Sequence, residues 1–165
     1  MSQGFKSWSS FYQRINLVFN ALIAISLLPF AYLYLEMQSA ANRQPMIDSS
    51  YALAIQIVGL VVVIVLLFIA HSRSKRDFDS LNMDQDLSGK LQQYYQTQLV
   101  RYVLMELSAV LSFAIVFLLR DFLFIAVYVI ILFWFSFVRP TYENVCKSLR
   151  LSKDERERIN NETFS

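Results

Sequence analysis

Cysteine, histidine, glycine and proline are all scarce in this sequence of 165 residues. The only cysteine is Cys146 and the only histidine is His71. A single thiol cannot form an internal disulfide, a Cys-x-x-Cys redox pair or a cysteine-based zinc site. Zinc sites take several Cys, His or carboxylate ligands together, and a haem needs an axial His or Cys in a suitable pocket, for which the lone His71 at a span end is weak support. We therefore predict no metal and no cofactor, and with three glycines and three prolines we expect few long loops.

Charge is also low. Charged residues make up 17% of the chain, against about 25% in typical soluble domains. The formal net charge of +2 is too small to indicate nucleic-acid binding, because proteins that bind nucleic acids have a strongly basic surface. No catalytic motif stands out, so we expect a protein that is not an enzyme.

Apolar residues are abundant, at 56% of the chain. They fall into four runs, at about 15–35, 51–70, 99–119 and 122–138. A helix needs about 17–25 such residues to cross ~30 Å of hydrocarbon. The sequence therefore predicts an all-α integral membrane protein with four transmembrane helices in two antiparallel hairpins. We expect one domain over residues 1–165, with a C-terminal helical tail over 139–165.

The basic residues predict the orientation of the chain in the bilayer. If the N-terminus is cytoplasmic, 13 of the 15 Lys and Arg residues face the cytoplasm and only Arg43 and Arg120 face outward. Short cytoplasmic loops carry such an excess of basic residues. Both termini are therefore predicted to be cytoplasmic, in a plasma membrane or a bacterial inner membrane.

Local signals mark the ends of the helices. Phe5, Trp8 and Tyr12 are spaced to form one apolar face, which predicts an interfacial helix before the first span. A second interfacial helix is expected after Pro140, and the motif Ser152-x-x-Glu155 predicts a capping box that opens a last charged helix. Arg120 and Asp121 leave room only for a tight turn between the third and fourth spans.

Polar residues within the spans are the candidate site. Span 1 carries Asn16, Asn20, Ala24, Leu27 and Ala31 on one stripe, which we expect to face protein, since small and amide side chains favour helix contact in lipid. Pro29 is expected to bend the same helix.

Glu106 is the sharpest candidate, because a carboxylate inside a membrane is costly and is by default a functional-site hypothesis. Together with Asn16, Asn20 and Arg101 it forms the predicted intramembrane polar cluster. A structural clamp, with Glu106 bonded to Asn20 or Tyr102, is preferred over a proton or cation site.

Two further groups of residues are candidate binding sites. Arg73, Lys75, Arg76 and Arg139 are predicted to contact lipid headgroups at the inner surface. Asp84, Asp86 and Ser88 have the spacing of the first half of a calcium-binding loop, but Tyr95 stands where a bidentate Glu is required. A helix cap is the preferred interpretation of that segment.

The predicted function is that of a non-enzymatic membrane protein that acts through helix packing, as an accessory or assembly subunit or as a homo-oligomer. The alternative is a small transporter or ion-pathway subunit that uses Glu106. The expected partners are the lipid bilayer and either a second copy or another membrane subunit, and no nucleic acid.

Overall fold

The computed structural model describes Phe5 and residues 7–38, 45–80 and 85–161, and it is helical almost throughout. Lys6, Arg43 and Asp84, which entered the predictions, lie outside these residues. The helices within them are α1 (Trp8–Gln38), α2 (Ser49–Asp79), α3 (Leu87–Leu119), α4 (Phe122–Phe137), α5 (Tyr142–Ser148) and α6 (Lys153–Asn160).

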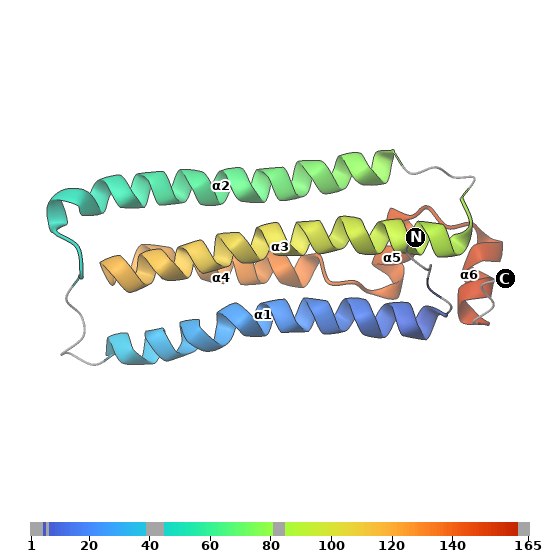
Figure 1. The fold of residues 1–165 in the computed structure, drawn as a ribbon, viewed down its shortest axis with the longest axis horizontal. Coiled ribbons are helices and arrows are strands. Elements are labelled where there is room, and N and C mark those ends of the chain that lie inside the picture. The colour runs from blue at the N-terminus through green and yellow to red at the C-terminus, as the bar shows by residue number, and fades with distance from the viewer. Residues whose placement is uncertain (1–4, 6, 39–44, 81–84, 162–165) are drawn as a thin grey trace.

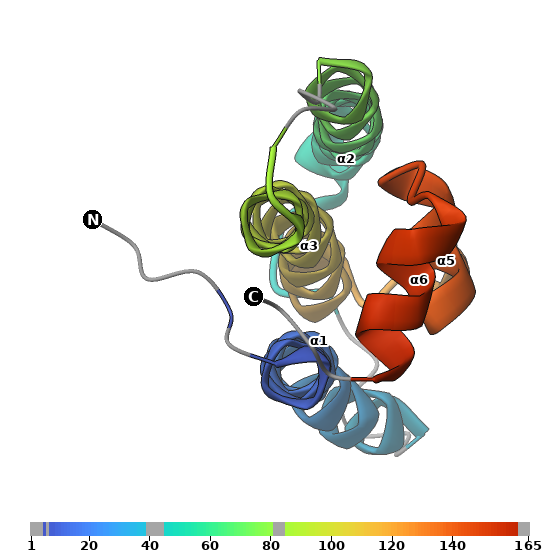
Figure 2. The same ribbon diagram turned by 90° about the vertical axis from the view of Figure 1, so that its right-hand side faces the viewer.

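The four long helices lie side by side with α3 at the centre (Figure 1). Helix α2 lies on one side of α3 and α1 on the other, and successive long helices run in opposite directions (Figure 1). The end-on view in Figure 2 places α5 and α6 together across one end of the bundle. Helix α1 begins and α6 ends at that same end.

Over the described residues, three helices are long and apolar enough to cross a membrane: α1, α2 and α3. Helix α4 has 16 residues, which at about 1.5 Å per residue falls short of ~30 Å of hydrocarbon. It becomes a fourth candidate only together with α5, across a bend of 78°. The prediction of a helical protein with membrane-spanning helices is thus supported, with three or four candidates.

Side-chain caps and a tight turn mark several helix boundaries. Asp48 caps α2 through a bond from the backbone N–H of Ser50 to its carboxylate, and Ser152 and Glu155 form the predicted capping box of α6. The tight turn between α3 and α4 is present, with Arg120 in the left-handed region at φ 54°. Asp121 caps α4 by accepting a bond from the backbone N–H of Leu123.

The separate N-terminal interfacial helix is a wrong prediction. Trp8 opens α1, which continues without a break to Gln38. No helix breaker lies between Trp8 and the first span, and the early aromatic side chains pack inside the protein: the Trp8 ring lies 5.6 Å from that of Tyr142 on α5. The ribbon of α1 does bend in its second half (Figure 1), as expected where Pro29 removes a backbone donor.

The core between α1, α3 and α4 is aromatic. Phe19 packs edge-on against Tyr102 with ring centroids 5.3 Å apart, and it also contacts Phe135 at 6.0 Å. Phe30 stacks on Tyr128 at 3.8 Å. These rings bring α1 and α4 against the same side of α3, and they position the polar groups described next.

Candidate functional site

Glu106 lies in a buried polar cluster where α1, α3 and α4 meet. Ser26 on α1 donates its hydroxyl proton to Glu106 Oε2 over 3.3 Å, and Tyr128 on α4 donates to Ser26 Oγ over 3.3 Å. Glu106 is 7% exposed, Ser26 is 4% exposed and Tyr128 is fully buried. One side chain from each of three helices therefore meets in the interior.

The direction of these bonds follows from the number of protons. A hydroxyl has one proton to donate and lone pairs to accept. If Tyr128 donates to Ser26, then the Ser26 proton is available either for Glu106 or for the backbone carbonyl of Ile23, 3.4 Å away. The cluster is thus a short chain from phenol to hydroxyl to carboxyl. Glu106 Oε1 has no hydrogen-bond partner among the described residues.

The predicted partners of Glu106 are wrong. Asn20 is exposed, and the Tyr102 hydroxyl donates to the carbonyl of Val138 over 3.0 Å instead. Ser26 was missed, although a signal was present: it lies on the same helix face as Phe19 and Phe30, seven positions after one and four before the other. A single hydroxyl within a stripe of large apolar residues indicates a polar contact in the core.

The predicted cluster of four residues is not one cluster. Asn16 donates its amide to its own helix, at the carbonyl of Tyr12 over 3.0 Å. Arg101 lines a hollow of about 270 Å³ together with His71 and Trp134. Glu106 alone lies at the α1–α3–α4 junction.

The stripe on α1 faces away from the other helices of its own chain. Asn20, Ala24, Leu27 and Ala31 are exposed. The buried face is the opposite one, with Phe11, Ile15, Phe19, Ser26, Phe30, Leu33 and Met37. Large apolar side chains fill the space beside α3 and α4 better than small ones do, which is why the periodic stripe of small residues did not identify the inner face.

A polar contact at the other end of the bundle was also missed. Arg120, in the α3–α4 turn, donates to Glu36 at the end of α1 over 3.5 Å, with the arginine side chain 5% exposed. Its Nε and Nη1 atoms have no partner among the described residues. Beside it, the Gln56 amide on α2 donates to Asp121. These contacts join α1 and α2 to the turn between α3 and α4.

At the opposite end, α6 is held to α3 by an ion pair. Lys90 Nζ lies 2.6 Å from Glu155 Oε1, with the two side chains 7% and 20% exposed. Burial opposes ionisation of Glu155, but hydrogen bonds from Lys90 and Ser152 outweigh it and lower the pKa of the carboxyl below its ordinary value. The charged form of Glu155 is thus the one that holds α6.

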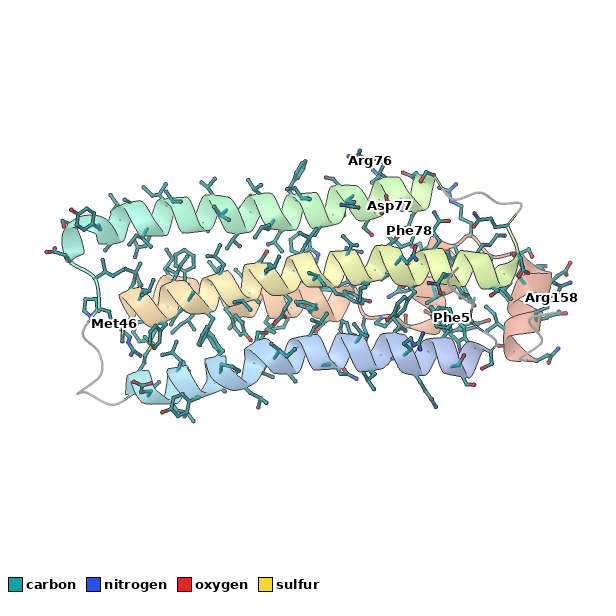
Figure 3. The ribbon with its side chains drawn as sticks, in the orientation of Figure 1. Phe5, Met46, Arg76, Asp77, Phe78 and Arg158 are labelled. Atoms are coloured by element: carbon teal, nitrogen blue, oxygen red, sulfur yellow. The ribbon has the colours of Figure 1, made fainter. Side chains whose placement is uncertain are left out.

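The residues predicted to contact lipid headgroups are exposed: Arg73, Lys75, Arg76 and Arg139. Figure 3 shows Arg76 pointing away from α3, whereas Phe78 points toward it. The Phe78 ring lies 5.5 Å from that of Tyr94. Among the described residues, no group of three or more His, Cys, Asp or Glu side chains is placed to hold a metal ion.

Comparison with known proteins gives no matching family model, no matching curated protein and no matching solved structure.

Proposed function

We propose that this protein is a non-enzymatic, multi-pass membrane protein that acts by helix packing, and that its α1 face of Asn20, Ala24 and Ala31 binds a second copy of the chain. The observation that carries the proposal is the exposure of Asn20. Its amide has no hydrogen-bond partner among the described residues, and it lies within the apolar part of α1.

A lone amide facing hydrocarbon is unfavourable, because lipid tails offer no hydrogen bonds. A second helix satisfies the amide, and small residues let the two backbones approach closely. Ala24 and Ala31 lie four and eleven positions after Asn20, which keeps them on one helix face. The face therefore combines a polar group that needs a partner with the small side chains that admit one.

The surroundings of Glu106 favour a structural role over a transport pathway. The carboxyl is packed between three helices and bonded to Ser26, which is in turn bonded to Tyr128. We infer that this cluster fixes the positions of α1 and α4 on α3. The rigid surface that results is what α1 presents to its partner.

The proposed topology has both termini in the cytoplasm. The support is the distribution of Lys and Arg, 13 of which lie on the side of the termini. The end of the bundle that holds α5 and α6 is then cytoplasmic, and the Arg120–Glu36 contact is on the outer side. A cysteine introduced at Asp121 should react with an impermeant thiol reagent added outside intact cells, and native Cys146 should not.

The association is tested by energy transfer between donor- and acceptor-labelled chains in lipid vesicles. Ala24→Leu is the test variant and Ala54→Leu, at an exposed position of α2, is the matched control. We expect Ala24→Leu and Asn20→Leu each to weaken association about tenfold, near the upper range for one interhelical contact in lipid. Ala54→Leu should leave association unchanged.

Three outcomes decide the proposal. A chain that is monomeric at every protein-to-lipid ratio would contradict it, and so would equal effects of Ala24→Leu and Ala54→Leu. A stable complex with a different membrane protein, lost in Ala24→Leu, would replace self-association by an accessory-subunit role.

A second candidate function is a proton or cation pathway through Glu106, and one observation favours it: Oε1 is buried with no partner among the described residues. In proteoliposomes, a pathway predicts flux that Glu106→Gln abolishes while the fold is kept, because only the carboxyl can change charge. Absence of flux in the wild type under proton, sodium and potassium gradients would remove this candidate.

A further inference from the structure

We infer that the protein binds one anionic phospholipid in a groove between α2 and α4, with the lipid phosphate beside Arg101 and His71. The inference goes beyond the proposed function, since the groove lies on α2 and α4 and not on the face of α1 that we propose for self-association. It rests on two adjoining hollows of opposite character.

The first hollow is apolar and encloses about 310 Å³. It is lined by Ile64, Leu67 and Phe68 of α2, with His71 and Trp134 at its edge. Ile64 and Phe68 are largely exposed, so the hollow opens sideways from the bundle. An acyl chain in this hollow makes apolar contacts like those it makes in the bilayer, and it packs against a protein surface of fixed shape.

The second hollow begins where the first ends. It encloses about 270 Å³, and it shares His71 and Trp134 with the apolar hollow. Beyond these two residues its lining is mixed: Arg101, Asn144 and Ser148 contribute polar groups beside the apolar Phe137 and Val138. A continuous path thus runs from apolar side chains to hydrogen-bond donors.

The charge of the second hollow suits an anion. Arg101 contributes a permanent positive charge, and none of the described residues that line the hollow is Asp or Glu. Arg101 has no ion pair with any carboxylate in the described part of the chain. A guanidinium binds phosphate oxygens in a bidentate manner, and the amide of Asn144 and the hydroxyl of Ser148 lie along the same lining.

The depth of the two hollows distinguishes a lipid from a soluble anion. His71 follows the last residue of the apolar run 51–70, and Arg101 lies two residues inside the run 99–119. Both therefore lie at the same boundary of the hydrocarbon, where lipid phosphates are found. Free phosphate would occupy only the polar hollow, whereas a phospholipid fills both hollows, with its phosphate in the polar one and an acyl chain in the apolar one.

The test uses the full chain purified in mild detergent, with native mass spectrometry to measure binding of phosphatidylglycerol and of phosphatidylcholine. Arg101→Gln should weaken phosphatidylglycerol binding about tenfold, which corresponds to the loss of one charge-assisted hydrogen bond of about 1.4 kcal/mol. Arg158→Gln, at an exposed arginine of α6 at the same end, is the control and should change binding less than about twofold.

The apolar hollow has its own pair of variants. Phe68→Ala should weaken binding of both lipids, and Phe133→Ala, at an equally exposed phenylalanine of α4 outside the groove, should weaken neither. Ser148→Leu places an apolar side chain in the polar hollow from outside the spans. It should reproduce the effect of Arg101→Gln, and it decides the matter if Arg101→Gln does not fold.

Other results would overturn the inference. Equal losses for Arg101→Gln and Arg158→Gln would indicate general attraction to a basic surface. Equal binding of phosphatidylcholine and phosphatidylglycerol would show that the negative charge of the lipid headgroup does not contribute to binding. If millimolar inorganic phosphate displaced phosphatidylglycerol and Phe68→Ala had no effect on lipid binding, the polar hollow would be a site for a soluble anion.

Discussion

Apart from the Phe78–Tyr94 contact near the end of α2, helix α3 meets α2 through small side chains, but it meets α1 and α4 through aromatic ones. The buried residues of α2 are Gly59, Val63, Ala70 and Ser74, and their spacing keeps them on one face. On the other side, α1 and α4 supply Phe19, Phe30, Tyr128 and Phe135 among others. One helix therefore carries two interfaces that are built in opposite ways.

The contacts of α3 with α1 and with α2 lie on opposite faces of α3. Ile115, which packs against Gly59, is nine positions after Glu106, and at about 100° per residue this separation is half a turn of the helix. Each interface depends on a different property of its side chains. Close backbone approach in lipid comes from the absence of side-chain volume, so the α2 interface is sensitive to added atoms. The aromatic interface is sensitive to their removal.

The largest effect is expected from removing volume on the aromatic side. Phe30→Ala deletes the ring that stacks on Tyr128. It should lower stability by about 2–3 kcal/mol, somewhat below the 3–5 kcal/mol of soluble cores, because lipid also solvates an exposed ring. Thermal or denaturant unfolding in detergent measures it. Phe137→Ala, at a highly exposed ring, is the control, and equal losses in both variants would remove the distinction.

Adding volume on the α2 side should be the next largest effect. A Cβ atom at Gly59 would overlap Ile115 Cδ1 and lie 3.3 Å from Phe124 Cζ. Because Cδ1 is the end of a flexible side chain, Gly59→Ala should be nearly neutral. Gly59→Leu should cost about 1–3 kcal/mol, as overpacked cores do. Unfolding of Ala54→Leu, at an exposed site on the same helix, should match the wild type; a tolerated Gly59→Leu would show that the interface is loose.

The polar cluster on the aromatic side gives a smaller effect. Glu106→Gln keeps the shape and an acceptor oxygen for Ser26, so its unfolding midpoint should stay close to that of the wild type. Glu106→Leu removes the acceptor and should cost about 1 kcal/mol, at the low end for an unpaired buried group, because Ser26 can turn to the carbonyl of Ile23. A large loss in Glu106→Gln would mean that the negative charge itself is needed.

The smallest effect is expected at the ion pair between α6 and the exposed end of α3. Since the pKa of Glu155 is lowered in the folded protein, its contribution is present above the ordinary pKa of a Glu and is lost as pH falls through the lowered value. Protection of α6 against hydrogen exchange should therefore decrease on acidification. Glu155→Gln should have weak protection at every pH, and a pH dependence that persists in that variant would point to another group.

The sequence predicted what depends on neighbouring residues and missed what depends on distant ones. The capping box at Ser152 and the turn at Asp121 are read from a few consecutive positions, and both are confirmed. The stripe of Asn16 and Asn20 was predicted to face protein, but the side of α1 that packs inside this chain is the one with Phe19 and Phe30, whose period is equally clear. Which of the two faces of α1 packs inside the bundle depends on the shapes of α3 and α4, which are remote in the sequence.

The contacts of Arg120 and Lys90 were unpredictable for the same reason. Each joins residues at least 65 positions apart, Lys90 to Glu155 and Arg120 to Glu36. Glu36 lies near the end of α1, where a side chain can also reach water. Nothing in the neighbourhood of a charged residue at a helix end tells whether solvent or a remote arginine will meet it.

The length of α3 links the end of the bundle that holds α6 to the buried junction at Glu106. With 33 residues, this helix extends about 50 Å, well beyond the ~30 Å of hydrocarbon. Lys90 near its start holds α6, and Glu106 sixteen residues later holds α1 and α4. An unbroken helix moves as a stiff rod, and rigid elements of this kind carry coupling between remote sites. A tilt at the start of α3, where α6 is held, would therefore also move the Glu106 end of the helix, together with α1 and α4.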